Sequence, residues 1–243
     1  MSASKPQLIT VQDNTSAGTL TAEQFKDLVA GLSMQAADDF NESCWVTQDL
    51  APAITVQAVP RGAKVPDDSW HIELLDVCDD PGALGYHEDA SFDRHSTGPK
   101  KASGRSSRGL RAGALTPLSK IGVKTSREDG VDPAEVASHE MLEMTVDPNV
   151  VSTVRSVINA AKKQKVIVEV GDPVQECGYK RGNVTVADFA LPAWFGLPQH
   201  VNPTQMSFRS SVKAAFELAP GGYISVAPRA TEDWTQVYGS AGA

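Results

Sequence analysis

The clearest periodic pattern lies near the start of the chain, where apolar residues recur every three or four positions. This spacing places one apolar stripe on a helix and leaves the charged residues largely off it. The stripe consists of Phe25, Leu28, Val29, Leu32, Ala36 and Phe40. Thr21 and Gln24 precede it at capping-box spacing, in which a hydroxyl and a side-chain amide satisfy each other's backbone donors. The pattern predicts a helix over about residues 22–41, preceded by a polar arm over residues 1–20.

Short β-rich segments punctuated by proline follow this helix, and more occur in the last third of the chain. Runs of β-branched and aromatic residues bounded by turn residues are typical of strands. We expect strands over residues 53–59, 71–77, 84–87, 165–170, 183–189 and 222–227. No internal repeat and no linker composition divides the chain, so the pattern predicts a single α+β domain over residues 1–243.

A second helix has a strong start. Asp132 suits the N-cap, and Pro133 suits the first helical position because its missing N–H has no partner there anyway. Asp147 precedes Pro148, and a residue before proline disfavours helical geometry, so the helix should end near Val146. A further helix is expected over about residues 151–163.

The helix over residues 133–146 carries polar groups on one arc. At about 100° per residue, Glu143 lies about 40° from His139, Asp147 about 80° and Glu140 about 100°. An imidazole and a carboxylate at positions i and i+4 can ligate one cation, while Glu140 can take a proton from a neighbouring water. This is the spacing of the HExxH zinc peptidases, with glutamate in place of the second histidine. Taken alone, the pattern is also typical of a solvated helix face.

Glu169 interrupts an apolar segment over residues 166–170. Strand alternation places it with Ile167, on the face opposite three valines. A carboxylate from downstream of the helix can complete a tetrahedral metal site and leave a fourth position for water. The alternative is a strand-edge glutamate that faces solvent.

Five motifs, in order along the chain, together resemble a family of zincin-like proteins with an SHExxE core, which has members in bacteria and among tailed bacteriophages. They are residues 82–87 (GALGYH), 137–144 (ASHEMLEM) with Asp147 and Pro148, 169–174 (EVGDPV), 184–195 (VTVADFALPAWF) and 220–223 (PGGY). The resemblance covers about residues 82–227, and it implies a zincin-like fold: a twisted mixed sheet beside a cleft floored by the HExxE helix.

The resemblance also implies a set of site residues. The metal ligands would be His139, Glu143 and Glu169, the general base Glu140, and further ligands or their orienting partners Asp147 and Asp172. Zinc is the first expectation for the divalent metal. One imidazole among several carboxylates offers more oxygen ligands than an ordinary zinc site, so calcium and manganese are alternatives.

Two details of the resemblance concern the edge of this cleft. The edge strand would end at Tyr86 and His87, and His87 is either a fourth ligand or oxyanion donor in the cleft or a hydrogen-bonded residue of the strand. Relatives tend to have cysteine where this chain has Gly171, and this departure makes the fold a firmer expectation than the activity.

The composition narrows the class of protein. Hydrophobic residues make up 41% of the chain, which excludes a disordered chain, and a net charge of −8 argues against nucleic acid or anionic lipid as a partner. Neither a membrane span nor a signal peptide occurs, so we expect a cytoplasmic, unprocessed chain.

Cys44, Cys78 and Cys177 lie far apart, which favours free thiols. Residues 96–113 are rich in Lys, Arg, Gly and Ser and predict a basic loop insertion, either solvated or a docking arm.

Two functions follow from these observations. The first is a metal-dependent hydrolase that cleaves a peptide held in extended form along the edge strand. The second is a structural subunit of a tailed-bacteriophage virion, which keeps the zincin scaffold without catalysis and contacts other virion proteins. The presence of Glu140 favours the first, since a purely structural site does not need it, whereas the degenerate motif and the basic loop favour the second. Either function is compatible with a homo-oligomer.

Overall fold

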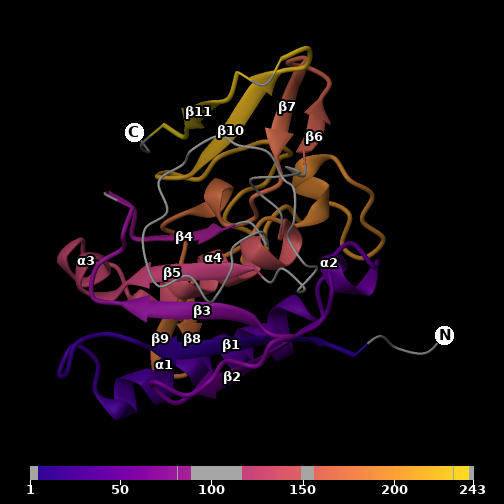
Figure 1. Ribbon diagram of the computed structural model, residues 1–243. Coiled ribbons are helices and arrows are strands. Elements are labelled where there is room, and N and C mark those ends of the chain that lie inside the picture. The colour runs from indigo at the N-terminus through magenta and orange to yellow at the C-terminus, as the bar shows by residue number, and fades with distance from the viewer. Residues whose placement is uncertain (1–4, 81, 89–116, 149–155, 232, 241–243) are drawn as a thin grey trace, which may run out of the picture.

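The largest sheet has five strands in the order β2-β1-β3-β5-β4 (Figure 1). The computed structural model describes residues 5–80, 82–88, 117–148, 156–231 and 233–240. The strands are β1 (Gln7–Asp13), β2 (Ile54–Val59), β3 (Trp70–Leu75), β4 (Gly85–Glu88) and β5 (Leu118–Gly122). All pairings are parallel except that of β4, which runs antiparallel to β5 and forms one edge. The expected α+β class, the mixed sheet and the edge strand at Tyr86 and His87 are confirmed.

The strand β1 lies inside this sheet, between β2 and β3, where the sequence led us to expect a polar arm. Ile9 and Val11 are fully buried, and the strand pairs with β2 on one side and β3 on the other. Its polar residues are satisfied internally: Thr10 Oγ1 lies 2.9 Å from His71 Nδ1, and Gln12 Nε2 donates to the Pro60 carbonyl at 2.8 Å. The expectation of an arm is therefore wrong for residues 7–13.

Both expected amphipathic helices are present. The first, α1 (Ala22–Met34), starts at the expected capping box and continues as the π-helix η1 (Gln35–Phe40). The second, α4 (Pro133–Val146), starts at the Asp132 cap with proline at its first position. Two short helices, α2 (Cys44–Thr47) and α3 (Val123–Glu128), are also present among the described residues. The helices α1 and α4 contact each other and pack on the five-stranded sheet (Figure 1).

Two smaller antiparallel sheets come from the last third of the chain. The hairpin of β8 (Tyr179–Arg181) and β9 (Val184–Val186) packs against α1 and α4. A four-stranded sheet in the order β11-β10-β7-β6 lies at the top of Figure 1. Its strands are β6 (Ser156–Asn159), β7 (Gln164–Ile167), β10 (Tyr223–Pro228) and β11 (Thr235–Tyr238). Short 3₁₀ turns, η2 (Asp172–Val174) and η3 (Pro192–Phe195), connect these elements to the core.

Three expectations for this region change. The helix expected over residues 151–163 is wrong where the structure describes it, because residues 156–159 form β6 and pair with β7. The side chain of Asn159 accepts a hydrogen bond from the Lys162 amide at 3.2 Å, and Lys163 has a positive φ of 55°, so the chain turns back instead of continuing as a helix. The strands expected over residues 165–170 and 183–189 end earlier, at Ile167 and Val186. The basic loop, residues 96–113, lies outside the described residues.

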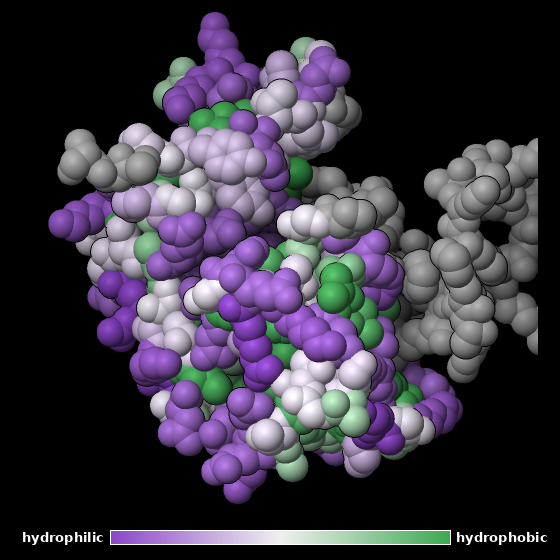
Figure 2. Space-filling view, turned by 90° about the vertical axis from the view of Figure 1, so that its left-hand side faces the viewer, coloured by the Kyte–Doolittle hydropathy of each residue, from purple (hydrophilic) through white to green (hydrophobic). Residues whose placement is uncertain are grey.

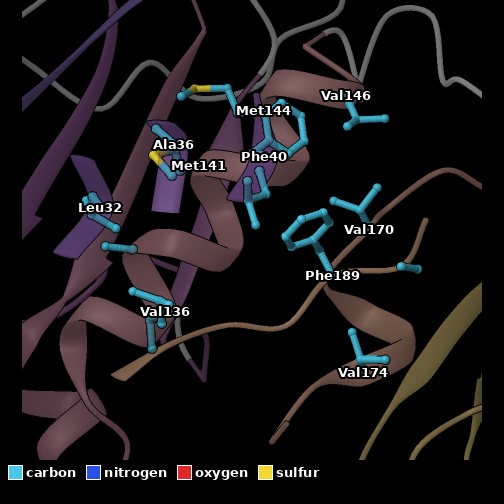
Figure 3. Packing of buried hydrophobic residues seen from close by; sticks show 14 of the residues in the cluster. Leu32, Ala36, Phe40, Val136, Met141, Met144, Val146, Val170, Val174 and Phe189 are labelled. Carbon is cyan, nitrogen blue, oxygen red and sulfur yellow. The ribbon is translucent and has the colours of Figure 1, made fainter. Parts of the chain in front are cut away.

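The helix α4 lies at the centre of the core. Figure 3 shows Met141 beside Ala36 of the π-helix, with the rings of Phe40 and Phe189 close by. The Phe40 and Phe189 rings meet edge-on with centroids 5.8 Å apart. The apolar face of α4 is thus occupied, which leaves its polar arc to face β4 and η2.

On the face shown in Figure 2, hydrophilic residues predominate and hydrophobic ones form small groups. Among the described helices, none has the length and apolar character needed to cross a membrane.

Candidate metal centre

The polar arc of α4 is buried, although charged residues in that number would ordinarily face water. Glu140 is 7% exposed, Glu143 3% and Asp147 2%. Buried carboxylates need a hydrogen-bond donor, a cation or a proton, because the charged form loses its hydration. The alternative of a solvated helix face is therefore wrong, and the partners of these groups define the site.

One cluster joins α4 to the η2 turn. His139 Nε2 lies 3.2 Å from Glu143 Oε1 and 3.3 Å from Asp172 Oδ1. Both distances exceed the roughly 2.7–2.9 Å of a charge-assisted hydrogen bond. They match the separation between two ligands of a tetrahedral ion with bonds of about 2.0–2.1 Å, which is about 3.3–3.4 Å. Donor atoms of all three residues lie within 4.8 Å of one another, so they could hold one metal ion.

The η2 turn holds Glu143 in place through backbone amides. The amide nitrogens of Gly171 and Asp172 donate to Glu143 Oε1 at 3.1 and 3.3 Å. A Cβ atom on Gly171 would lie 2.5 Å from His139 Nδ1, so no side chain fits between this turn and the imidazole. Glycine at this position thus has a physical reason: the backbone packs directly on a candidate ligand.

A second cluster joins α4 to the edge strand β4. His87 Nδ1 lies 3.0 Å from Glu140 Oε2 and 4.0 Å from Glu143 Oε2, so the two oxygens of Glu143 face different clusters. The His87 side chain is 5% exposed, and its Nε2 atom has no hydrogen-bond partner among the described residues. His87 is therefore a hydrogen-bonded residue of the edge strand, as one of the two alternatives predicted. Its donor atom also lies within ligand spacing of Glu140 and Glu143.

Glu169 does not join either cluster of the described residues. It follows the end of β7, and the alternation still holds there, because Val168 and Val170 are fully buried while Glu169 is half-buried. Its carboxyl group shares a hydrogen bond with Asp172. Asp172, and not Glu169, therefore completes the candidate donor set with His139 and Glu143.

Asp147, the fifth acidic residue of the predicted site, caps the C-terminal end of α4. It lies outside both clusters, and its negative charge acts on His87.

Tyr223 is a site residue that the sequence analysis did not assign. Its hydroxyl hydrogen-bonds the Asp172 carboxyl group from the start of β10. The PGGY motif brings it there, since a Cβ on Gly222 would lie only 2.3 Å from the Pro173 carbonyl oxygen. The Ala219 amide also donates to that oxygen at 2.9 Å. The motif was noticed as part of a resemblance, but the pairing with η2 depends on tertiary structure.

The charges of the site are unbalanced, because acidic groups outnumber the imidazoles. The acidic side chains are Glu140, Glu143, Asp147, Glu169 and Asp172, and the imidazoles are those of His87 and His139.

Raised pKa values of several of these groups favour bound protons, which would compensate part of this charge. Burial raises the pKa of Glu169 well above its ordinary value, and the charges of Asp172 and Glu143 raise it further. Burial and Glu143 also raise the pKa of Asp172. For His139, burial opposes the charged ring, but Glu143 and Asp172 outweigh it and hold its pKa well above the ordinary value. For His87, burial likewise opposes protonation, yet Glu140 and Glu143 raise its pKa.

A divalent cation would compensate the same charge without protons. The donor set of one imidazole and two carboxylates, with a further carboxyl behind it, fits such an ion. Comparisons of the chain with protein-family models, curated proteins and solved structures return no match. The residues of the site therefore carry the functional argument.

Proposed function

We propose that this protein is a metal-dependent hydrolase of peptide bonds on a zincin-like fold, with zinc as its metal. One observation carries the proposal: the partly buried His139 and the buried Glu143 and Asp172 form one donor set, and beside it lies Glu140, a buried carboxylate outside that set. A purely structural ion needs the donors but not the neighbouring carboxylate. A hydrolase needs both, because a general base must stand close to the metal without ligating it.

Each residue of the site has its own role in the proposed reaction. A divalent metal held by His139, Glu143 and Asp172 would supply Lewis-acid polarisation of the scissile carbonyl and acidify the attacking water. Tyr223 and Glu169 orient Asp172 through hydrogen bonds.

Glu140 carries out the proton transfers. It accepts a proton from the attacking water on the carboxylate oxygen that does not face His87 Nδ1. It then delivers this proton to the amine nitrogen as the C–N bond breaks, so the water is divided between the two products. Among the described residues β4 is an edge strand, and its backbone would pair with an extended peptide.

The test is the substitution Glu140→Gln, assayed on an unfolded protein such as denatured casein and on a mixed peptide library. We expect metal content and melting temperature to stay at the wild-type level and hydrolysis to fall by about 10² to 10⁴, the usual effect of losing a general base. Glu135→Gln makes the same change on the same helix outside both clusters, and we expect it to leave hydrolysis unchanged.

The alternative function is a virion scaffold in which the same ion only stabilises the fold. Binding of metal with a rise in melting temperature, together with no hydrolysis by the wild-type protein, would favour this alternative. Glu140→Gln would then change neither stability nor assembly into particles.

A further inference from the structure

The edge strand β4 lies unusually close to the HExxE helix because Gly85 has no side chain. A Cβ atom there would lie 2.7 Å from Val136 Cγ1 and 3.1 Å from Glu140 Cγ, both on α4. Successive side chains of a strand alternate between its faces, so His87, two residues further on, points to the same side. The close approach of β4 therefore brings the His87 ring onto the polar arc of α4.

The hydrogen bond between His87 and Glu140 has a defined direction. A general base is an ionised carboxylate, which can only accept, so in the proposed function the 3.0 Å contact places a proton on His87 Nδ1. That proton is present both in the cationic ring and in the neutral Nδ1–H tautomer. In either state Glu140 Oε2 accepts the hydrogen bond, and the other carboxylate oxygen is available to a different partner.

The burial of this pair argues against a role in packing alone. The His87 side chain is 5% exposed, and Nε2 has no hydrogen-bond partner among the residues that the structure describes. An unsatisfied buried nitrogen destabilises a fold, whereas an apolar side chain of similar size would fill the same space without it. What histidine adds at this position is the Nδ1–H donor directed at Glu140.

We infer that His87 is a positioning residue: it fixes the rotamer of Glu140 so that one chosen carboxylate oxygen faces the attacking water. The inference deepens the proposed function and rests on it. It also assigns β4 two tasks, because the strand that would pair with the peptide backbone would also orient the general base.

Three variants test the inference by steady-state kinetics with metal content measured in parallel. His87→Leu removes the donor and keeps similar bulk, so we expect kcat to fall about 10- to 100-fold, as when groups that orient active-site residues are removed, with KM and metal content unchanged. His87→Asn places an amide N–H near the position of Nδ1 and should recover most of kcat. His87→Gln places its amide near the position of Nε2 and should not. If the leucine variant does not fold, the comparison of asparagine with glutamine carries the test.

A matched control exists elsewhere in the sheet. His71 is also a buried histidine with its Nδ1 atom hydrogen-bonded, but its partner is Thr10 on β1, away from both clusters. His71→Leu should lower stability without changing kcat per folded molecule.

A readout without substrate separates the inference from the proposed function. In protein labelled with ¹⁵N-histidine, NMR should show a protonated, hydrogen-bonded Nδ1 on His87 whose proton resonance shifts in Glu140→Gln. An unprotonated Nδ1, or a wild-type kcat in His87→Leu, would overturn the inference while leaving the hydrolase intact. Absence of hydrolysis by the wild-type protein would overturn the proposed function and the positioning role with it.

Discussion

The substitution Gly171→Ala tests directly how the η2 turn and the His139 imidazole fit together. The backbone at Gly171 is helical, with φ −83° and ψ −38°, so alanine can adopt it without strain. The added methyl group would nevertheless lie 2.5 Å from His139 Nδ1 and 2.7 Å from Cε1. Any loss of stability or of metal affinity must then come from this contact and not from backbone conformation.

Two opposing effects set the magnitude. Replacing glycine by alanine at a compatible position stabilises a protein by about 0.4–1 kcal/mol through the unfolded chain. Overpacking a well-filled site costs about 1–3 kcal/mol. We therefore expect a net loss of about 1–2 kcal/mol in the free energy of unfolding. If the ring turns away instead, the loss appears as metal binding about 10- to 100-fold weaker.

The assay is a double-mutant cycle with His139→Ala, followed by urea denaturation and by titration calorimetry with Zn²⁺. Without the imidazole the methyl group has room, so Gly171→Ala should be neutral or stabilising in that background. We expect a coupling free energy of about 1–3 kcal/mol between the two positions. Coupling below about 0.5 kcal/mol, together with wild-type zinc affinity in Gly171→Ala, would refute the packing argument.

Two further predictions concern ions and protons at the same site. Zn²⁺ at a hundredfold excess over its Kd should stabilise the protein by about 2.7 kcal/mol, which is measured as a rise in Tm. Chelator should reverse this rise, and His139→Ala should abolish it. A Tm that chelator does not change would contradict metal binding. In chelated protein, stability should fall as pH rises above 4.5, the ordinary pKa of Glu169, because the folded state retains a proton that the unfolded chain has already lost. Glu169→Gln cannot ionise and should flatten this slope in urea denaturation; an unchanged slope would show that Glu169 does not hold the proton.

The helices α1 and α4 were predictable because their determinants are local. The capping box at Thr21 and the Asp132–Pro133 start each lie within a few residues of the helix they begin. The spacing of His139 and Glu143 likewise follows from helix geometry alone. The strand β1 could not be recognised in this way, because Thr10 and Gln12 look like surface residues until their partners on other segments are known.

The remaining site residues depend on where strands end and which elements meet. The sequence pattern continues the strand through Glu169, whereas the structure ends β7 at Ile167 and turns the chain so that Asp172 reaches His139. The approach of His87 requires β4 to pack on α4, and that of Tyr223 requires β10 to pack on η2. None of these contacts has a local pattern, so the sequence supports the helical half of the site better than its other half.

The position of β1 between β2 and β3 also affects the order in which the molecule can fold. Its partners lie far along the chain, as the pairings of Ile9 with Val56 and Trp70 show, and β3 in turn pairs with Leu118 on β5. Parallel strands cannot start from a tight hairpin, and distant pairings must close long loops before they gain any contact. The hairpins β6–β7 and β8–β9 are free of that delay, since their strands are neighbours. We therefore expect closure of the five-stranded sheet to limit refolding, with its unpaired strands exposed to aggregation until β1 is enclosed.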